Sequence, residues 1–424
     1  MNYIKLEEDN YNLHVINTNK FKTIMLKINF KRKLKKEEIS MRNMLVNVLF
    51  ESTKKYPTKR LMEIQTEELY ELGYRGSNYS SGIYNIMGFD CVFLNPKYSE
   101  DTIVEQSFEF LKEILFNPNI DENGFDSKSF GIAHKILEEH LSSLKENADL
   151  YSQIRLYEEL EPNGIISYRK CGYNEDLNNI NRKNLYEYYL DVLNNDIIDI
   201  FVVGDVDAAE ISQKLKKLFS FKPRNKASDN HFYSSNFKRE TINCKTELTE
   251  FNQSKLLFGL KINDATEFEL RYVLNILNYI LGGSPDSKLF QNVREKNSLC
   301  YTISSVSQPL ISVLLIHAGI NANDYDQTCS LILSQIEDMK NGKFEQLDIE
   351  KAVLTYKNSM IEISETPDGL ISLYSGIEYL GSDDLEERNK KIETVTKDDV
   401  VNLAKKISLD TIFFLEGGEE NGDK

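Results

Sequence analysis

The segment NMLVN at residues 43–47, read with FESTKKYP at residues 50–57, decides how this chain is interpreted. Apolar residues around it recur at the spacing i, i+3, i+4, i+7 and i+8, which is one face of an amphipathic helix. These residues are Met41, Met44, Leu45, Val48 and Leu49. Asn43 and Asn47 are four residues apart and so share another face of that helix. The pattern predicts a helix from residue 41 to about residue 50.

A helix can hold zinc with two imidazoles at this spacing, and a carboxylate between them can act as a general base. Here the two positions carry the amides of Asn43 and Asn47, whereas zinc sites use His, Cys and Asp or Glu. Val46 stands between them and cannot take a proton from water. Without their neighbours, these residues would also fit an ordinary surface helix that carries two asparagines.

The neighbouring residues resemble the pitrilysin/insulinase family of zinc peptidases. In that family the motif H-x-x-E-H is followed by an apolar-Phe-x-Gly-Thr run and then by a proline. When Phe50 is set on the family's Phe, Asn43 and Asn47 fall on the two histidines and Val46 falls on the glutamate. The resemblance implies a protease fold without the protease chemistry, with no metal bound by this chain and no catalytic residue in it.

The family's third zinc ligand is a glutamate on a later helix. Residues 130–140 are the implied counterpart, with Glu138 or Glu139 nearest, and the spacing leaves both open. One carboxylate would not hold zinc when both histidines are replaced. His134 and Glu138 also lie four residues apart, but apart from His140 no other His or Cys is near in sequence. A solvated helix face therefore explains this pair better than a second metal site.

A second motif, GGSPDSKLF at residues 282–290 followed by VREKNSLCY at 293–301, is similar to the family's C-terminal-domain pattern. In active relatives, its Arg and Tyr reach the zinc site of the other domain or subunit, hold the substrate backbone and polarise the scissile carbonyl. The matching residues here are Arg294 and Tyr301. Both offer donors to a carbonyl oxygen that gains negative charge. Taken alone, Arg294 could be a surface charge at a helix end and Tyr301 a core strand residue.

Length and composition limit the class of protein. A chain of 424 residues is too long for one core, so two or three domains are expected. The net charge of −16 argues against nucleic acid and anionic membranes as partners. Five scattered cysteines without a C-x-x-C pair indicate a reducing compartment. We read no signal peptide and no bilayer-spanning run, and therefore expect a cytoplasmic protein.

The order of predicted elements indicates a duplicated α+β fold. A cap, a helix, an apolar strand and a glycine follow one another over residues 180–204, with the strand at 197–203, and again over residues 395–417, with the strand at 411–415. Strands and helices interleave without regular βαβ spacing. We expect two homologous domains with mostly antiparallel sheets flanked by helices, which face each other across a cavity. Their predicted bounds are 1–222 for the domain with the degenerate zinc helix, 223–238 for a linker, and 239–424 for the domain with the Arg/Tyr motif.

Several local elements are also predicted. Ser40 is a plausible N-cap for the helix at 41–50, and Gly73 is a plausible C-cap for a helix over 61–72. Further predictions are strands at 23–30, 77–84 and 89–94, a helix at 107–115, and one helix from residue 130 to about 160.

These observations favour one function over two others. The chain would be the non-catalytic, substrate-binding subunit of a heterodimeric zinc metallopeptidase acting on peptides, with zinc and base in an H-x-x-E-H partner. Alternatively, it would be a peptide-binding or assembly scaffold without a peptidase partner. The least favoured reading is an active zinc metalloendopeptidase with ligands elsewhere.

Overall fold

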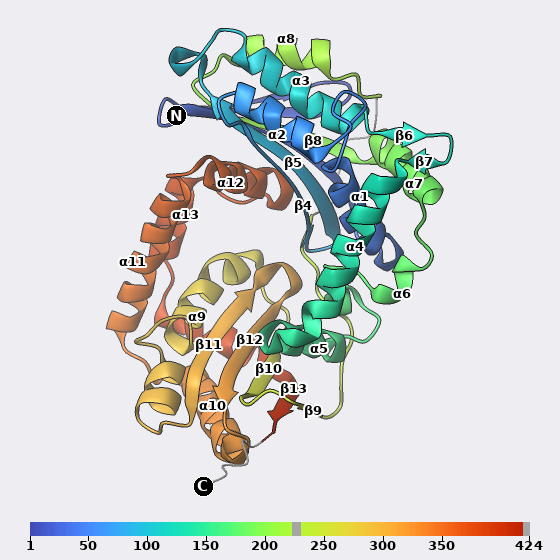
Figure 1. Cartoon of the computed structure of the whole chain (residues 1–424). Helices are drawn as coiled ribbons and strands as arrows, with labels where there is room; N and C mark the ends of the chain where they lie inside the picture. Colours follow the sequence, from blue (N-terminus) through green and yellow to red (C-terminus); the bar gives the residue numbers. More distant parts are fainter. Residues whose placement is uncertain (223–229, 419–424) are drawn as a thin grey trace. The chain divides into compact units, whose positions relative to one another are not determined.

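The computed structural model describes residues 1–222 and 230–418 of the chain, and Figure 1 shows its elements. The chain forms two compact units. Unit 1 consists of residues Met1–Ser143, Arg169–His231 and Ile363–Leu380. Unit 2 consists of Leu144–Tyr168, Phe232–Glu362 and Gly381–Lys424. Each unit has its own sheet and its own core.

Unit 1 is built on a sheet in the order β1-β2-β8-β3-β5-β4. Its strands are β1 (Asn2–Glu7), β2 (Asn12–Asn17), β3 (Thr23–Lys33), β4 (Gly73–Ser81), β5 (Tyr84–Leu94) and β8 (Ile197–Gly204). Strands β2 and β8 run parallel, and all the other neighbours run antiparallel. A short hairpin, β6 (Ile120–Asp121) with β7 (Gly124–Phe125), lies apart from this sheet.

Helices cover both faces of the unit 1 sheet. The helices of unit 1 are α1 (Ile39–Leu49), α2 (Lys59–Glu68), α3 (Ile103–Phe116), α4 (Ser127–Ser143), α6 (Asn174–Leu177), α7 (Arg182–Asn195), α8 (Ala208–Leu218) and α12 (Pro367–Leu380). Helices α1, α3 and α8 pack on one face against β4, β5 and β2. Helix α12 packs on the other face, where Leu370, Ile371 and Tyr379 join a core with Met25, Phe201 and Val203.

Unit 2 is built on a sheet in the order β11-β12-β10-β13-β9. Its strands are β9 (Asn243–Thr249), β10 (Ser254–Ile262), β11 (Cys300–Gln308), β12 (Val313–Ile320) and β13 (Ile407–Gly417). Its helices are α5 (Ala148–Leu160), α9 (Leu274–Leu281), α10 (Tyr325–Lys340), α11 (Gln346–Ile363), α13 (Leu385–Glu393) and α14 (Lys397–Lys405). Two π-helical segments, Glu269–Val273 and Phe290–Glu295, precede and follow α9.

The two units repeat one topology. In both sheets a parallel pair, β2/β8 or β9/β13, is followed by three antiparallel strands, β3-β5-β4 or β10-β12-β11. The helices α7 and α14, which lead into β8 and β13, both begin with a capping box, built by Asn181 with Asn184 and by Thr396 with Asp399. The duplicated α+β fold with mostly antiparallel sheets is therefore confirmed.

One helix of each repeat belongs to the other unit. Helix α5 follows α4 in sequence but packs on β10 and β13 in unit 2, where Leu156 and Leu160 lie in the core. Helix α12 follows α11 but packs on β8 in unit 1. The predicted domain bounds, 1–222 and 239–424, refer to the two sequence repeats, and they stay a prediction. Residues 223–229 of the predicted linker lie outside the described residues.

Four local predictions differ from the structure. The helix predicted from residue 130 to 160 is broken, because residues 144–146 form a 3₁₀ turn and Asn147 starts α5 by accepting a hydrogen bond from Leu150 N. The second predicted helix is α2, which ends at Glu68, and Gly73 begins β4. Helix α1 begins at Ile39, so Ser40 lies within it. The strand expected at 411–415 begins earlier, at Ile407.

Candidate functional site

Helix α1 carries the three positions that correspond to the zinc motif. Asn43 is half-buried, and its Nδ2 donates to Ile39 O and to Lys170 O, both at 3.0 Å. The amide therefore joins α1 to the loop that precedes α6. Asn47 lies one turn further along and is also half-buried. An amide that already donates to two backbone carbonyls is part of the packing of α1.

Val46 occupies the predicted position of the general base. Its side chain is 7 % exposed. It packs against Gly76 of β4, where a Cβ atom would lie 2.6 Å from Val46 Cγ1. Phe50 closes the other side of this contact and stacks on Tyr74 and on Phe89. A carboxylate here would lie in an apolar packed contact, where its charge is costly.

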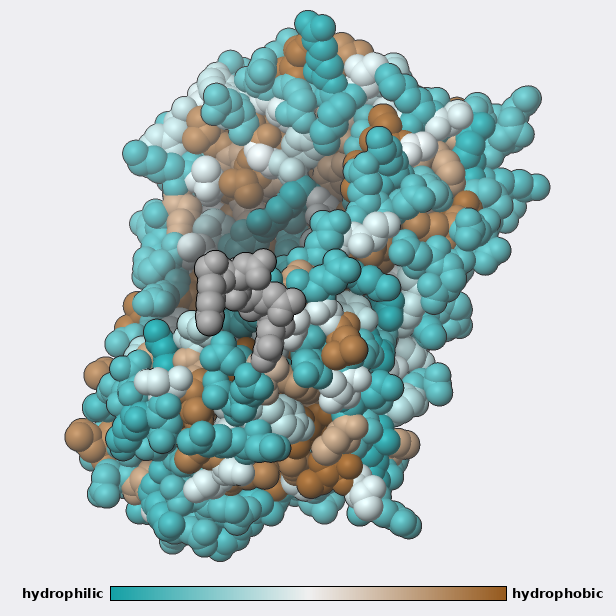
Figure 2. All heavy atoms as spheres, turned by 60° about the horizontal axis from the view of Figure 1, so that its bottom comes forward, coloured by the Kyte–Doolittle hydropathy of each residue, from teal (hydrophilic) through white to brown (hydrophobic). Residues whose placement is uncertain are grey.

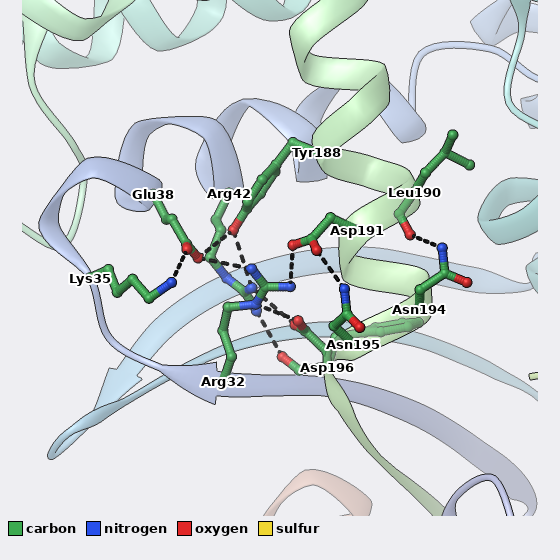
Figure 3. Close-up of polar contacts among 11 residues, drawn as sticks. Arg32, Lys35, Glu38, Arg42, Tyr188, Leu190, Asp191, Asn194, Asn195 and Asp196 are labelled. Carbon is green, nitrogen blue, oxygen red and sulfur yellow. Dashed lines mark hydrogen bonds and ion pairs between the residues drawn. The ribbon is translucent and has the colours of Figure 1, made fainter. Parts of the chain in front are cut away.

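A buried ion-pair network fixes α1 to the rest of unit 1 (Figure 3). Arg42 is 1 % exposed, and its guanidinium donates to Asp196 Oδ2 at 2.9 Å and to Phe30 O at 2.9 Å. Asp196, fully buried, also pairs with Arg32. Arg32 further contacts Glu38 at 3.1 Å and Asp191 at 2.7 Å. The network connects α1, β3 and the turn between α7 and β8.

Glu38, Asp191 and Tyr188 keep the protonation states that are usual for their side chains at neutral pH. Burial disfavours ionisation of Glu38, but hydrogen bonds from Lys35 and Tyr188 and the Arg32 charge outweigh it and lower its pKa. Burial similarly opposes ionisation of Asp191, but the hydrogen bond from Arg32 lowers its pKa. Burial raises the pKa of Tyr188, which donates to Glu38 Oε2 at 2.9 Å. The carboxylates of the cluster are thus paired with cations, whereas the buried Nε of Arg42 has no hydrogen-bond partner among the described residues.

The two glutamates proposed for the third ligand position are exposed. Glu138 and Glu139 lie on α4, which packs against α1. Helix α4 buries a different face, made of Ser129, Ala133, Leu137 and Leu141. Glu139 is paired with Lys135 at 3.6 Å on the outer surface. Within residues 1–222 and 230–418, no group of three or more His, Cys, Asp or Glu side chains is arranged to hold a metal ion.

Arg294 and Tyr301 both lie in unit 2, Arg294 in the segment before β11 and Tyr301 at the start of β11. Arg294 lies in the π-helical segment Phe290–Glu295, with its side chain 41 % exposed and its guanidinium 4.6 Å from the centre of the Phe290 ring. Ser298, between the two, has a left-handed φ of 54°. Such irregular backbone is common at functional sites.

Tyr301 is turned outward by a β-bulge. Cys300 pairs with Ile320 and Thr302 with Gly319, so that Tyr301 has no partner on β12. Its side chain is 61 % exposed, which excludes the core-strand interpretation. It lies on the wall of a cavity of about 650 Å³ that is also lined by side-chain amides. They belong to Asn252, Gln253, Asn321 and Asn323. Bulges re-aim side chains and are frequent next to active sites.

Comparison with known proteins agrees with this geometry. The profile described as "Peptidase M16 inactive domain" matches residues 179–356. A Bacillus subtilis protein described as "Probable inactive metalloprotease YmfF" is 28 % identical over 424 residues, 99 % of each chain. The chain is thus similar to M16 metalloprotease homologues, one of which is described as inactive. This confirms the resemblance to the inverted-motif zinc peptidases, and the replaced residues of α1 agree with it.

Two further comparisons extend this M16 relationship. The crystal structure of a conserved protein from Enterococcus faecalis V583 has a TM-score of 0.92 and 29 % identity, and covers 99 % of this chain and 100 % of that one. A second Bacillus subtilis protein, "Uncharacterized zinc protease YmxG", is 26 % identical over 287 residues, 64 % of each chain. In the part of this M16 homologue that is described, no helix is long and apolar enough to cross a membrane.

Sequence reasoning placed the zinc-motif positions on one helix but did not find Arg42. The signal was a charged residue inside an otherwise apolar helical segment, next to Asn43. Its partner Asp196 is 154 residues away in sequence, so no local pattern links the two residues.

Figure 2 shows one face of the molecule. Hydrophilic residues cover most of this face.

Proposed function

We propose that this M16 homologue is the non-catalytic, substrate-binding subunit of a heterodimeric zinc metallopeptidase that acts on peptides in the cytoplasm. The partner is an M16 chain with an intact H-x-x-E-H motif, which supplies the zinc ion and the general base. This chain supplies Arg294 and Tyr301. Neither nucleic acid nor a membrane takes part.

The observation that carries the proposal is the contrast between Val46 and Tyr301. Val46 is 7 % exposed and absorbed into packing, so the position of the base serves only stability. Tyr301 is 61 % exposed at a bulge that has no evident structural purpose. A phenolic OH held at the surface can donate to a carbonyl oxygen as it gains negative charge. A chain that lacks the general base but keeps a hydrogen-bond donor such as Tyr301 could assist a reaction for which another subunit supplies the zinc ion and the base.

Two surfaces support peptide binding. The cavity beside Tyr301 is lined by Gln253 and Asn321. Gln253 Oε1 accepts from Lys255 Nζ and Asn321 Nδ2 donates to Asp324. The other atom of each amide, the donor Gln253 Nε2 and the acceptor Asn321 Oδ1, is of the kind that bonds a peptide backbone. Strand β4 is one of the two edge strands of the unit 1 sheet, and among the described residues only β5 pairs with it. An extended peptide can add to such an edge through main-chain hydrogen bonds.

The scaffold alternative makes a different prediction about partners. Bacillus subtilis has both a relative described as an inactive metalloprotease and one described as a zinc protease, which supports a pair of M16 chains in one cell. The test is affinity purification of the tagged chain from its source organism, followed by zinc analysis and peptide cleavage assays.

The proposal expects co-purification of an H-x-x-E-H protein, one zinc per pair, and cleavage that needs both chains. Recovery with other proteins alone would favour the scaffold. Stoichiometric zinc and chelator-sensitive cleavage by this chain alone would show an active peptidase and contradict the proposal.

A further inference from the structure

A cavity of about 410 Å³ lies within unit 1, between α12 and the face of the sheet on which α12 packs. Lys27 of β3, Tyr79 of β4 and Ile86 of β5 form its sheet side. Ile371, Ser375 and Leu380 are among the α12 residues on its other side. Its volume falls within the range of pockets that hold small molecules, about 300–1,000 Å³.

The cavity exists because α12 presents small residues to the sheet. The α12 residues that line it include Ser372, Ser375, Gly376 and Tyr379, which follow the helical spacing of one face. On either side of the hollow, Ile371 and Tyr379 are buried and fix the helix to the sheet. Tyr379 is held by Asn29 Nδ2 at 3.2 Å and by Lys31 Nζ, 3.8 Å from the ring centre.

Lys27 brings a positive charge to this cavity. Its side chain is half-buried, and its stem passes over Gly88, which has no side chain to block it. Lys27 lies opposite Asp90 on β5, and its positive charge acts to lower the pKa of that carboxyl, but among the described residues no hydrogen bond or ion pair within 4.0 Å holds Lys27 Nζ. The nearby carboxylate of Asp90 is instead bound by Arg75 Nε at 2.7 Å, and Arg75 also pairs with Asp368. A partly desolvated ammonium without a partner is costly unless an anion joins it.

Tyr79 adds a hydroxyl donor beside an apolar wall. Its pKa is raised to about 12, first by burial and then by the negative charges of Asp199 and Asp90, so the phenol stays protonated at neutral pH. Ile86 pairs with Tyr79 across the two strands, and Ile86 and Ile371 are both buried. One end of the cavity therefore carries the Lys27 ammonium and the Tyr79 hydroxyl, with the Asp368 carboxylate also in its lining, and its walls are aliphatic.

We propose that this cavity is a binding site for an amphipathic monocarboxylate. The carboxylate is bound by Lys27 Nζ and the Tyr79 hydroxyl, and the aliphatic part lies against Ile86 and Ile371. The carboxylates of Asp90 and Asp368 disfavour a second negative charge on the ligand. This chemistry is shared by the C-terminal residue of a peptide and by a short-chain fatty acid. The site lies wholly within unit 1 and does not depend on a peptidase partner.

Titration calorimetry on the full chain tests this inference with three probes. They are N-acetyl-L-leucine, which represents a peptide C-terminus, hexanoate, which represents a fatty acid, and N-acetyl-L-leucinamide, which lacks the charge. We expect one molecule of at least one carboxylate probe to bind per chain at millimolar concentration or below. We expect the amide probe not to bind. The carboxylate probe that binds more tightly shows whether the natural ligand is a peptide C-terminus or a fatty acid.

Two variants place the binding in this cavity. Lys27→Met keeps the length of the side chain but removes the charge, and should weaken binding about ten- to a hundredfold. Ser375→Leu fills the cavity and should abolish binding. The matched controls are Lys22→Met, an exposed lysine just before β3, and Ser142→Leu, an exposed serine on α4, and neither should alter affinity. Circular dichroism and the unfolding midpoint confirm that each variant is folded.

Three results would overturn the proposal. The first is that neither carboxylate binds to the folded wild-type chain. The second is that N-acetyl-L-leucinamide binds as tightly as N-acetyl-L-leucine. The third is that carboxylate binding survives unchanged in folded Lys27→Met. A failure to find a peptidase partner would leave these measurements unaffected, so the two proposals fail separately.

Discussion

Val46 of α1 lies directly against the backbone of Gly76 on β4. A Cβ atom on Gly76 would lie 2.6 Å from Val46 Cγ1 and 2.6 Å from Phe50 Cε2. Contacts this short do not occur between real Cβ atoms and their neighbours, so one side chain would have to move. The position that we predict to correspond to the catalytic glutamate of active relatives is thus a packing contact between helix and strand.

Gly76→Ala should therefore destabilise the protein by about 1–3 kcal/mol, because the added methyl group overpacks this contact. Val46→Ala in the same chain should recover part of the loss, since it makes room for the methyl group. Urea unfolding of the two single variants and the double variant measures the coupling. Gly131→Ala on α4, whose Cβ would meet no atom within 4 Å, is the control and should be neutral or stabilising. Additive effects of the two substitutions would contradict a direct contact.

Arg42→Met should destabilise the fold by about 3 kcal/mol, because Asp196 would remain buried with one cation fewer. Arg32 still pairs with Asp196, which keeps the loss at the lower end of the range for a broken buried pair. The measurement is the free energy of unfolding in urea at neutral pH. Arg60→Met, at an exposed site on α2, should change it by less than about 0.5 kcal/mol. Equal effects of both substitutions would show that the network does not fix α1.

His231 should make the stability of the protein fall at mildly acidic pH. Burial, aided by the charge of Lys31, lowers its pKa to about 3, and its ring is stacked between Tyr84 and Tyr379. The unfolded state therefore binds more protons than the native state between about pH 3 and about pH 6.5, and stability rises with pH there. The contribution is complete above the unfolded pKa and is lost as pH falls, by at most about 1.4 kcal/mol per pH unit.

The variant His231→Phe isolates this effect, because it keeps an aromatic ring at the position but cannot titrate. As pH falls from 7 to 5, we expect the free energy of unfolding of the wild type to fall by more than that of the variant. Carboxylates titrate in both proteins and cancel in the difference. A difference that is constant over this range would mean that His231 has an ordinary pKa in the folded protein.

In the reconstituted pair, Tyr301→Phe should lower peptide turnover about a hundred- to a thousandfold, because a lost oxyanion donor costs roughly 2.7–4 kcal/mol. Arg294→Ala should also weaken substrate binding. Neither change should lower the unfolding midpoint, since both side chains are substantially exposed. Tyr98→Phe, at another exposed tyrosine, is the control. If both variants turn over peptide at the wild-type rate, Arg294 and Tyr301 have no role in catalysis, and the interpretation as an assembly scaffold is favoured.

Local patterns in the sequence predicted the duplicated fold. The capped helices at 182–195 and 397–405 lead into strands that occupy the same place in both sheets. The break between α4 and α5 was missed because apolar spacing continues on both sides of it. Asn147, followed by Asp149, was a cap signal within that segment. The exchange of α5 and α12 depends on contacts more than a hundred residues apart, which no local pattern contains.

The candidate site was predictable where its residues belong to one element. Asn43, Val46 and Asn47 share α1, and the bounds of that helix were correct to within about two residues. Ser40 was misassigned as a cap because its hydroxyl has distant partners, Asp176 and the N–H of Tyr173. The role of Arg294 and Tyr301 stays a prediction, but the bulge that turns Tyr301 outward could not be read from the sequence.

The exchange of α5 and α12 between the two units also indicates how a chain with two repeats can arise. Each repeat sends its own helix to the sheet of the other repeat. Two identical copies of a single repeat that exchanged this helix would form a domain-swapped homodimer. Joining the two copies into one polypeptide would fix that swap permanently. It would also free each repeat to diverge, so that one could lose residues that the other, or a later partner, still provides.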